Sequence, residues 1–162
     1  MKSVAAIPSK IYSLPDLLIE VKRWRLKNRT IVFTNGVFDI LHEGHISSLS
    51  EAASYGDMLI VAVNSDGSVK KLKGPSRPVN KQDARALLLA SMVFTDAVII
   101  FDEDTPRELI AGLLPDVLVK GGDYTIEQIA GSREVIANGG KVVLAKIVEG
   151  VSTTGIIEKM RK

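Results

Sequence analysis

The chain has 162 residues, 46% of them hydrophobic and 25% charged, which is the balance of an ordinary soluble protein with one domain. Its 21 basic and 19 acidic residues leave a net charge of only +2, too small for a protein that coats nucleic acid or a membrane surface. The absence of cysteine excludes disulfides, thiolate catalysis and cysteine-ligated zinc, and the apolar runs are too short to cross a bilayer. We therefore expect a cytoplasmic protein without a targeting leader.

The first predicted element is an amphipathic helix over residues 14–27. Its apolar residues recur at intervals of three and four, and Pro15 suits a first helical turn. Because Trp24 falls on the apolar stripe, we interpret it as a core anchor of this helix and not as a ligand-stacking residue. We assign residues 1–28 to an amino-terminal extension that includes this helix, and residues 29–162 to a single domain.

Five short β-branched runs follow, and each is typical of a strand buried on both faces, as in a parallel sheet. Helical patterns lie between most of them, such as the one that carries Ile46, Leu49 and Ala53 and ends at Gly56. This alternation predicts an α/β fold with a Rossmann-like doubly wound sheet, mainly parallel, with helices on both faces. Ligands bind such sheets beyond the carboxyl ends of the strands. The predicted strands cover residues 31–34, 58–63, 97–100, 117–119 and 142–145.

Two later helices are expected to begin at recognisable caps. Asn80 with Asp83 fits the pattern of a capping box ahead of a helix over residues 84–92. Thr105 and Pro106 suit a hydroxyl cap and a first-turn proline for the next helix. Arg85, in the first of these helices, is only a weak site candidate, because it could simply pair with a carboxylate on the surface.

The most informative segment, residues 34–45, places His42 and His45 three residues apart where a strand gives way to a helix. A helix begins with unpaired N–H groups and a partial positive charge, so imidazoles beside it would face a bound anion. Gly44 keeps the approach free of a side chain. Taken alone, a pair of histidines at this spacing is equally consistent with a surface accident or half of a zinc site.

Two more groups could contact phosphate. Lys70 and Lys73 follow a strand end and precede a Gly-Pro loop, a setting suited to a cationic clamp on a triphosphate or an acceptor phosphate. Near the end of the chain, Ser152, Thr153 and Thr154 precede apolar residues at helical spacing. They predict another helix entrance that faces phosphate, because an ordinary N-cap explains one hydroxyl and not three.

Residues after two other strand ends are candidates for contacts to the sugar and the base. Asp39 could hold a sugar hydroxyl or help to position Mg²⁺, although an aspartate after an apolar strand equally caps the next turn. Lys120 follows a predicted strand and precedes Gly121 and Gly122, which permit the backbone to approach a flat base closely. Asp123 would then contact polar atoms of a nucleotide or its ribose.

The 34–45 segment resembles the signature of the superfamily that transfers a nucleoside monophosphate from a nucleoside triphosphate, in which His-x-Gly-His follows Gly-x-Phe-Asp. The hydroxyl cluster near the end of the chain corresponds to a second hallmark. The resemblance implies that the two histidines donate hydrogen bonds to the α- and β-phosphates in the transition state, with the two lysines as further catalytic groups. It also implies a nucleotide site that includes Thr34, Asn35, Gly36, Phe38 and Gly44.

Beyond these hallmarks, the chain from about residue 31 to its end resembles the adenylyltransferase half of the bifunctional heptose-phosphate kinase/adenylyltransferases of lipopolysaccharide-precursor synthesis. The matching blocks cover residues 34–39, 69–74, 101–105, 115–123 and 148–154. The resemblance implies transfer of AMP from ATP, with Mg²⁺, to D-glycero-β-D-manno-heptose 1-phosphate, giving ADP-heptose and pyrophosphate. Asp39 and Arg77 would contact the acceptor, no side chain is assigned as a metal ligand, and a homo-oligomer is expected. The matching blocks include none from the kinase half, so if this sequence is the complete protein, a separate chain would supply the kinase step.

Two alternatives stay open. A cytidylyltransferase that acts on a polyol or amino-alcohol phosphate would use the same donors, although its branch typically has an arginine where this chain has Ile147. A non-catalytic nucleotide-binding module would keep the fold and lose turnover. The joint presence of both histidines, both lysines and the hydroxyl cluster argues against the second alternative.

Overall fold

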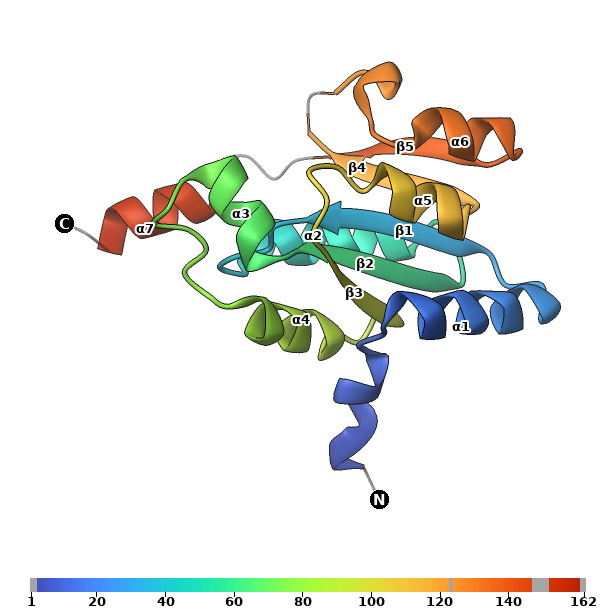
Figure 1. Ribbon diagram of the computed structural model, residues 1–162, viewed down its shortest axis with the longest axis horizontal. Helices are drawn as coiled ribbons and strands as arrows, with labels where there is room; N and C mark the ends of the chain where they lie inside the picture. Colours follow the sequence, from blue (N-terminus) through green and yellow to red (C-terminus); the bar gives the residue numbers. More distant parts are fainter. Residues whose placement is uncertain (1–2, 123, 147–151, 161–162) are drawn as a thin grey trace.

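The five β-branched runs form one parallel sheet at the centre of the computed structural model, which describes residues 3–122, 124–146 and 152–160 (Figure 1). Every predicted strand is present, extended by a residue or two, and the predicted α/β class is confirmed. The strands are β1 (Ile31–Gly36), β2 (Met58–Asn64), β3 (Ala97–Phe101), β4 (Val117–Gly121) and β5 (Lys141–Ala145).

The strand order is β3-β2-β1-β4-β5, so the chain winds outward from β1 in one direction and then returns to wind outward in the other. The order reverses between β1 and β4, which pair in parallel with Thr34 opposite Val119. Connections leave these two strands toward opposite sides, and a crevice opens between them at their carboxyl ends.

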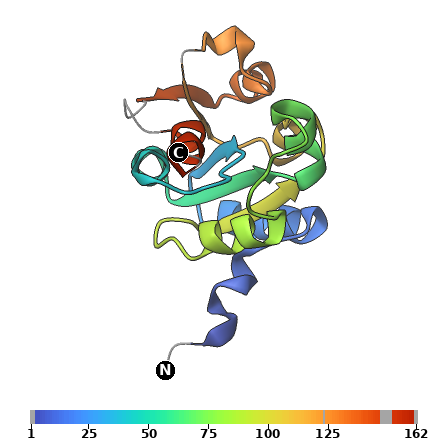
Figure 2. The ribbon, with the colours of Figure 1, turned by 90° about the vertical axis from the view of Figure 1, so that its left-hand side faces the viewer.

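Helices cover both faces of the sheet, and Figure 2 shows α2 on one side and α1 on the other. One apolar layer packs the sheet against α1, α5 and α6, and a second packs it against α2 and α4. Helices α3 and α7 lie beyond the carboxyl ends of the strands, at the left of Figure 1. The helices are α1 (Leu14–Leu26), α2 (Glu43–Ala53), α3 (Asp66–Lys73), α4 (Gln82–Ala90), α5 (Arg107–Leu113), α6 (Ser132–Ala137) and α7 (Thr153–Met160), with short 3-10 turns at Val4–Ala6, Pro8–Lys10 and Ile126–Gln128.

The amino-terminal helix belongs to the first apolar layer. Leu17, Val21 and Trp24 are all buried beneath α1, with the Trp24 side chain only 6% exposed, as expected of a core anchor. Burying each of these side chains contributes roughly 1.5–3 kcal/mol. The division of the chain after residue 28 stays a prediction. Within the described residues, no helix combines the length and the apolar character that a bilayer crossing needs.

Both predicted helix caps are wrong. The N-cap of α4 is Lys81, without a side-chain cap bond, because Asn80 uses its own N–H and amide group to bind Asp39 instead. The first residue of α5 is Arg107, so that Pro106 becomes the N-cap and Thr105 caps nothing. At Asn80, the long-range contact with Asp39 replaces the expected local cap of α4, and residue spacing alone does not reveal such a contact.

Candidate active site

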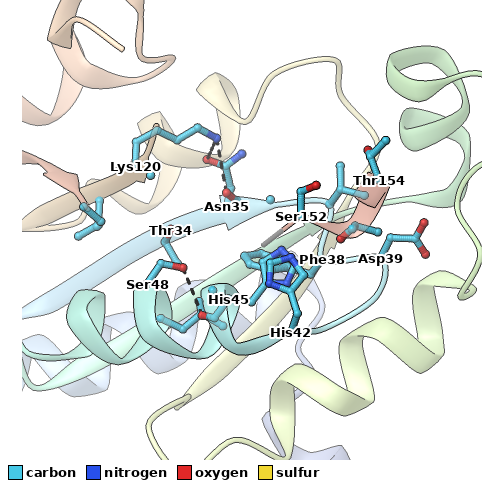
Figure 3. Close-up of a pocket in the computed structure, with 18 of the residues that line it drawn as sticks. Thr34, Asn35, Phe38, Asp39, His42, His45, Ser48, Lys120, Ser152 and Thr154 are labelled. Atoms are coloured by element: carbon cyan, nitrogen blue, oxygen red, sulfur yellow. Dashed lines mark hydrogen bonds between the residues drawn. The ribbon is translucent and has the colours of Figure 1, made fainter. Parts of the chain in front are cut away.

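A cavity of about 430 Å³ opens at the carboxyl ends of β1 and β4, where the strand order reverses (Figure 3). Its walls come from β1 and the loop behind it, from α2 and β4, and from the start of α7. It brings together most of the residues expected from the sequence. They are Thr34, Asn35, Gly36, Phe38, Asp39, His42, Gly44, His45, Lys73, Arg77, Lys120, Gly121, Ser152, Thr153 and Thr154.

Two expected residues, Lys70 and Gly122, do not line this cavity, and a third, Asp123, is not described. Lys70 lies on the exposed surface of α3 and outside the lining of the cavity, whereas Lys73, one helical turn later, lines it. Gly122 also lies outside the lining, and Asp123 lies outside the described residues. The structure therefore favours Lys73 over Lys70 as the lysine that reaches a bound ligand.

The two histidines stack on each other at the entrance of α2. His42 is the N-cap residue, and its ring centroid lies 3.9 Å from that of His45. The Phe38 ring meets His45 edge to face at 5.4 Å, and Figure 3 shows the three rings together. Both Nδ1 atoms are buried, and neither has a hydrogen-bond partner among the described residues. Buried polar atoms are rarely left unsatisfied, so this pair is a candidate to receive a ligand.

Burial also sets the charge of the two rings. It lowers the pKa of His42, and it lowers the pKa of His45 to about 4, with the nearby His42 as a second cause. Both rings are thus predominantly neutral at pH 7. A neutral imidazole carries one N–H donor, so each ring can donate a hydrogen bond to a phosphate oxygen without carrying a full charge.

The glycine and the phenylalanine of the Gly-x-Phe-Asp motif together place the Phe38 ring against His45. The Phe38 backbone is left-handed, with φ of 48°, a conformation that folds its side chain back toward the strand. A Cβ atom on Gly36 would lie only 3.0 Å from the Phe38 ring. Glycine at this position therefore leaves room for the ring that packs against His45.

The three hydroxyl groups near the start of α7 make different contacts. Ser152 accepts a hydrogen bond from the Gly155 N–H at 3.0 Å and so acts as an ordinary cap. The Thr153 hydroxyl donates to the Ile40 carbonyl oxygen at 3.2 Å, which ties α7 to the loop ahead of the histidines. Thr154 lines the cavity without a described side-chain bond. The contact through Thr153 brings the two sequence motifs together across the length of the chain.

Lys120 supplies a half-buried positive charge. Its Nζ atom lies 3.4 Å from Oδ1 and 3.5 Å from the carbonyl oxygen of Asn35, and no carboxylate is among its described contacts. Burial lowers the pKa of Lys120 because water no longer solvates the ammonium fully. A bound anion would compensate this charge.

A second cavity of about 360 Å³ adjoins the first and shares Asn35, Lys73, Lys120 and Tyr124 with it. The two lysines thus lie where the two cavities meet. Sequence reasoning missed the polar residues that line only the second cavity. Two of them, Asp104 and Thr105, fall in the matching block 101–105, which was their available signal. The full set is Asn64, Asp104, Thr105 and Gln128.

The geometry favours a supporting role for Asp39, in place of the expected contact to an acceptor. Its side chain is fully buried and accepts hydrogen bonds from Arg77 Nε at 2.6 Å and from the N–H groups of Val79 and Asn80. Burial alone would raise the pKa of Asp39, but these donors together hold it below its ordinary value. Figure 3 shows the carboxylate pointing away from the imidazole rings.

The described residues do not fit a magnesium ion held by the protein. Among the described lining residues of the first cavity, Asp39 is the only carboxylate, and protein donors occupy it. The described chain also has no group of three or more side chains that could hold a metal. Magnesium that arrives with a nucleoside triphosphate would need few protein ligands, because phosphate oxygens and water complete its octahedron.

Comparison with known proteins gives three findings. A model of the cytidylyltransferase-like family matches residues 33–159. The bifunctional protein HldE of Enterobacter sp. (strain 638) is 55% identical over 147 residues, and HldE of Escherichia coli (strain K12 / DH10B) is 54% identical over 147 residues. Each match covers 91% of this chain and 31% of the relative, so the chain spans about a third of the length of these curated relatives. The crystal structure of the lipopolysaccharide core biosynthesis protein from Thermoplasma volcanium GSS1 is similar with a TM-score of 0.59 and 28% identity, over 74% of this chain and 97% of that one.

Proposed function

Because the chain belongs to the cytidylyltransferase-like family, we propose that it transfers AMP from ATP to D-glycero-β-D-manno-heptose 1-phosphate and releases pyrophosphate. The observation that carries nucleotidyl transfer is the convergence of His42, His45 and the hydroxyls at the start of α7 on one cavity. The choice of a heptose phosphate rests on the matching sequence blocks and on the similarity to HldE. The similar crystal structure is that of a lipopolysaccharide core biosynthesis protein, which supports the same choice.

In this reaction an oxygen of the acceptor phosphate attacks the α-phosphorus of ATP, and the bond to the bridging oxygen breaks as pyrophosphate leaves with the electron pair. The enzyme must align two anions that repel each other and stabilise the charge on the transferred group. The two neutral histidines would donate hydrogen bonds to the α- and β-phosphates. Magnesium would enter bound to ATP, as part of the substrate.

The acceptor would occupy the second cavity, with its phosphate at the boundary between the cavities. Lys73 and Lys120 lie at that boundary, where one pair of cations can contact both reacting phosphates. The amide, hydroxyl and carboxylate groups of Asn64, Thr105 and Asp104 suit the hydroxyls of a sugar. Arg77 lines only the first cavity, and its expected contact to the acceptor stays a prediction. A cytoplasmic location and a homo-oligomeric state also stay predictions.

The direct test is pyrophosphate release from ATP or CTP across a panel of acceptors. The panel contains D-glycero-β-D-manno-heptose 1-phosphate, its α anomer, mannose 1-phosphate and glycerol 3-phosphate. We expect turnover with ATP and the β anomer at a kcat/KM far above that of every other pair. Turnover with CTP and glycerol phosphate alone would replace the proposal by the cytidylyltransferase alternative. Nucleotide binding without turnover on any acceptor would favour a non-catalytic module.

A further inference from the structure

Arg85 is the largest fully buried side chain in the described part of the protein. Its Nη1 atom donates to the carbonyl oxygens of Val37 and Asn64, both at 2.7 Å, and its Nε donates to the Asn80 carbonyl oxygen at 2.9 Å. Its Nη2 atom binds the Asp66 carboxylate at 2.8 Å. Arg85 thus pairs with a carboxylate, as the sequence allowed, but the guanidinium is buried in the fold and not on the surface.

The acceptors of Arg85 belong to three segments of the chain, namely the loop after β1, the junction of β2 with α3, and the loop after α3. Val37 lies in the loop between β1 and the histidines, Asn64 ends β2, and Asp66 begins α3. Asn80 lies in the loop between α3 and α4 and also binds Asp39, through both its N–H and its side-chain amide. Arg85, Asn80 and Asp39 thus form one continuous network of buried and half-buried residues, named here the Arg85 network.

The Arg85 network contacts the two segments whose side chains are proposed to act on phosphate. They are the loop over residues 37–42, called here the histidine loop, and the helix α3, which carries Lys73. On one side it binds the histidine loop at Val37 and, through Asn80, at Asp39. On the other side it binds the lysine helix α3 at its first residue, Asp66, and binds the loop that follows α3 at Asn80. The first residue of the helix that carries Lys73, and the loop residue Asn80 seven positions after that helix ends, are therefore both bound to the network that contacts the histidine loop.

Stability alone does not explain an arginine at this place. A buried ion pair is often no more stabilising than apolar residues of the same volume, because desolvation offsets the attraction. The planar guanidinium has instead a geometric use, since its fork of donors fixes several acceptors at set distances and angles. Lysine, with one ammonium on a flexible stem, cannot reproduce that arrangement.

We propose that Arg85 is a positioning residue that sets the separation between Lys73 and the paired histidines. It touches no substrate, and it acts through the Val37 and Asn80 carbonyl oxygens and the Asp66 carboxylate. The inference rests on the proposed transferase function only for its activity assay. Its structural part does not depend on that function: loss of the Arg85 guanidinium should let α3 and the histidine loop move apart.

The test is a double-mutant cycle on kcat with Arg85→Lys and Lys73→Ala. We expect Arg85→Lys to lower kcat about 100-fold, because a misplacement of about 1 Å in a catalytic group has that effect. Lys73→Ala should also lower kcat on its own. In the Arg85→Lys background, Lys73→Ala should lower kcat much less, leaving a coupling of about 10-fold or more. Additive effects of the two substitutions would overturn the proposal.

Two further variants separate positioning from general destabilisation. Val135→Ala removes a buried methyl pair in the apolar layer on the other face of the sheet, and its effect on kcat should be additive with that of Lys73→Ala. Non-additivity in this control pair would also overturn the proposal. Asn80→Ala deletes only the amide that donates to Asp39, so it should reproduce the coupling at reduced size.

Amide hydrogen exchange tests the network without any substrate. The N–H groups of Val79 and Asn80, which bind Asp39, should exchange at least about 10-fold faster in Arg85→Lys, with no change in the amides of β4. Unchanged exchange at both positions would overturn the network whether or not the protein turns over any acceptor. If the wild-type protein showed no turnover while amide exchange was faster in Arg85→Lys, the result would count against the proposed function alone.

Discussion

The two ends of the sheet differ in how their charged side chains and imidazoles are bonded. At the amino end, an aspartate directly ahead of a strand binds the backbone at the start of the neighbouring strand, and this arrangement occurs three times. Each aspartate donates its own N–H to a carbonyl oxygen of the neighbour and accepts an N–H from the neighbour at 2.7–2.8 Å. The pairs are Asp57 with Thr30, Asp96 with Leu59, and Asp116 with Ile31.

At the carboxyl end, the described residues leave the buried Nδ1 atoms of His42 and His45 without a partner and Lys120 without a carboxylate. Such groups cost stability unless a ligand binds them. We infer from this contrast that the bonds at the amino end stabilise the fold, and we propose that the carboxyl end binds a polyanionic ligand. Substitutions at the two ends should therefore separate stability from activity.

The largest expected effect is that of His45→Ala or His42→Ala. Each should lower kcat by about 10²–10³-fold, or roughly 3–4 kcal/mol of transition-state stabilisation, because a hydrogen-bond donor to the phosphates is lost. The melting temperature should fall little, since neither ring makes a described side-chain hydrogen bond within the protein. Single-turnover rates with saturating ATP and acceptor measure the effect. An unchanged kcat in either variant would contradict the assigned role.

Lys120→Met should give the next largest effect, with opposite signs for activity and stability. We expect kcat/KM to fall by about 100-fold, because the cation between the two cavities is lost. The free energy of unfolding should stay level or rise, because methionine needs no solvation in this half-buried position. Initial rates and denaturant melts of the same preparation give both quantities. A clear loss of stability would show that Lys120 has a structural partner.

Asp116→Ala is the matching change at the amino end and should affect only stability. It removes the acceptor of the Ile31 N–H and should lower the free energy of unfolding by about 1–3 kcal/mol. The value of kcat should stay within about twofold of the wild type, because the site lies at the other end of the strand. Urea melts and steady-state rates check both expectations, and a large loss of kcat would refute the separation of the two ends.

The pH dependence of stability should also differ between the ends. Since the folded-state pKa of His45 is about 4 against 6.5 in the unfolded chain, the unfolded state binds more protons between these values, and stability falls as the pH drops from 6.5 to 4. Solvent reaches part of the ring, so the loss should be only on the order of 1 kcal/mol. The pKa of Asp57 is lowered mainly by the Thr30 N–H, so its contribution is lost only below about pH 3.8. Thermal melts at pH 7.5, 5.5 and 4.5 test the histidine, with His45→Gln as the variant that should flatten the curve.

Local patterns predicted most of the fold and the centre of the site. β-Branched runs set the five strands, and the 34–45 segment placed both histidines at a helix entrance, because these features depend on neighbours in sequence. The family suggested by His-x-Gly-His is confirmed by the match over residues 33–159. Each of the three aspartates at the amino end lies one residue before its strand in the sequence. This regular position becomes a recognisable signal only once the bonds to the neighbouring strands are known.

Several of the features that the sequence did not predict depend on contacts between distant segments. Arg85 looks like a surface residue in sequence, and only the folded chain brings Val37, Asn64 and Asp66 around it. Asn80 looks like a helix cap, but its side chain is turned toward Asp39, to which its N–H and its amide nitrogen donate, and α4 begins after Lys81. The second cavity was missed for the same reason, because its lining comes from the ends of several strands that no spacing rule connects.

Nitrogen NMR of the two imidazoles tests the central claim most directly, because His42 and His45 are the only histidines in the sequence. In the free protein both rings should be neutral at pH 7. On addition of ATP and magnesium without an acceptor, the ring nitrogen signals of both should shift as hydrogen bonds to phosphate form. Rings that titrate near pH 6.5 and do not respond to ATP would contradict a triphosphate site at the carboxyl end of the sheet.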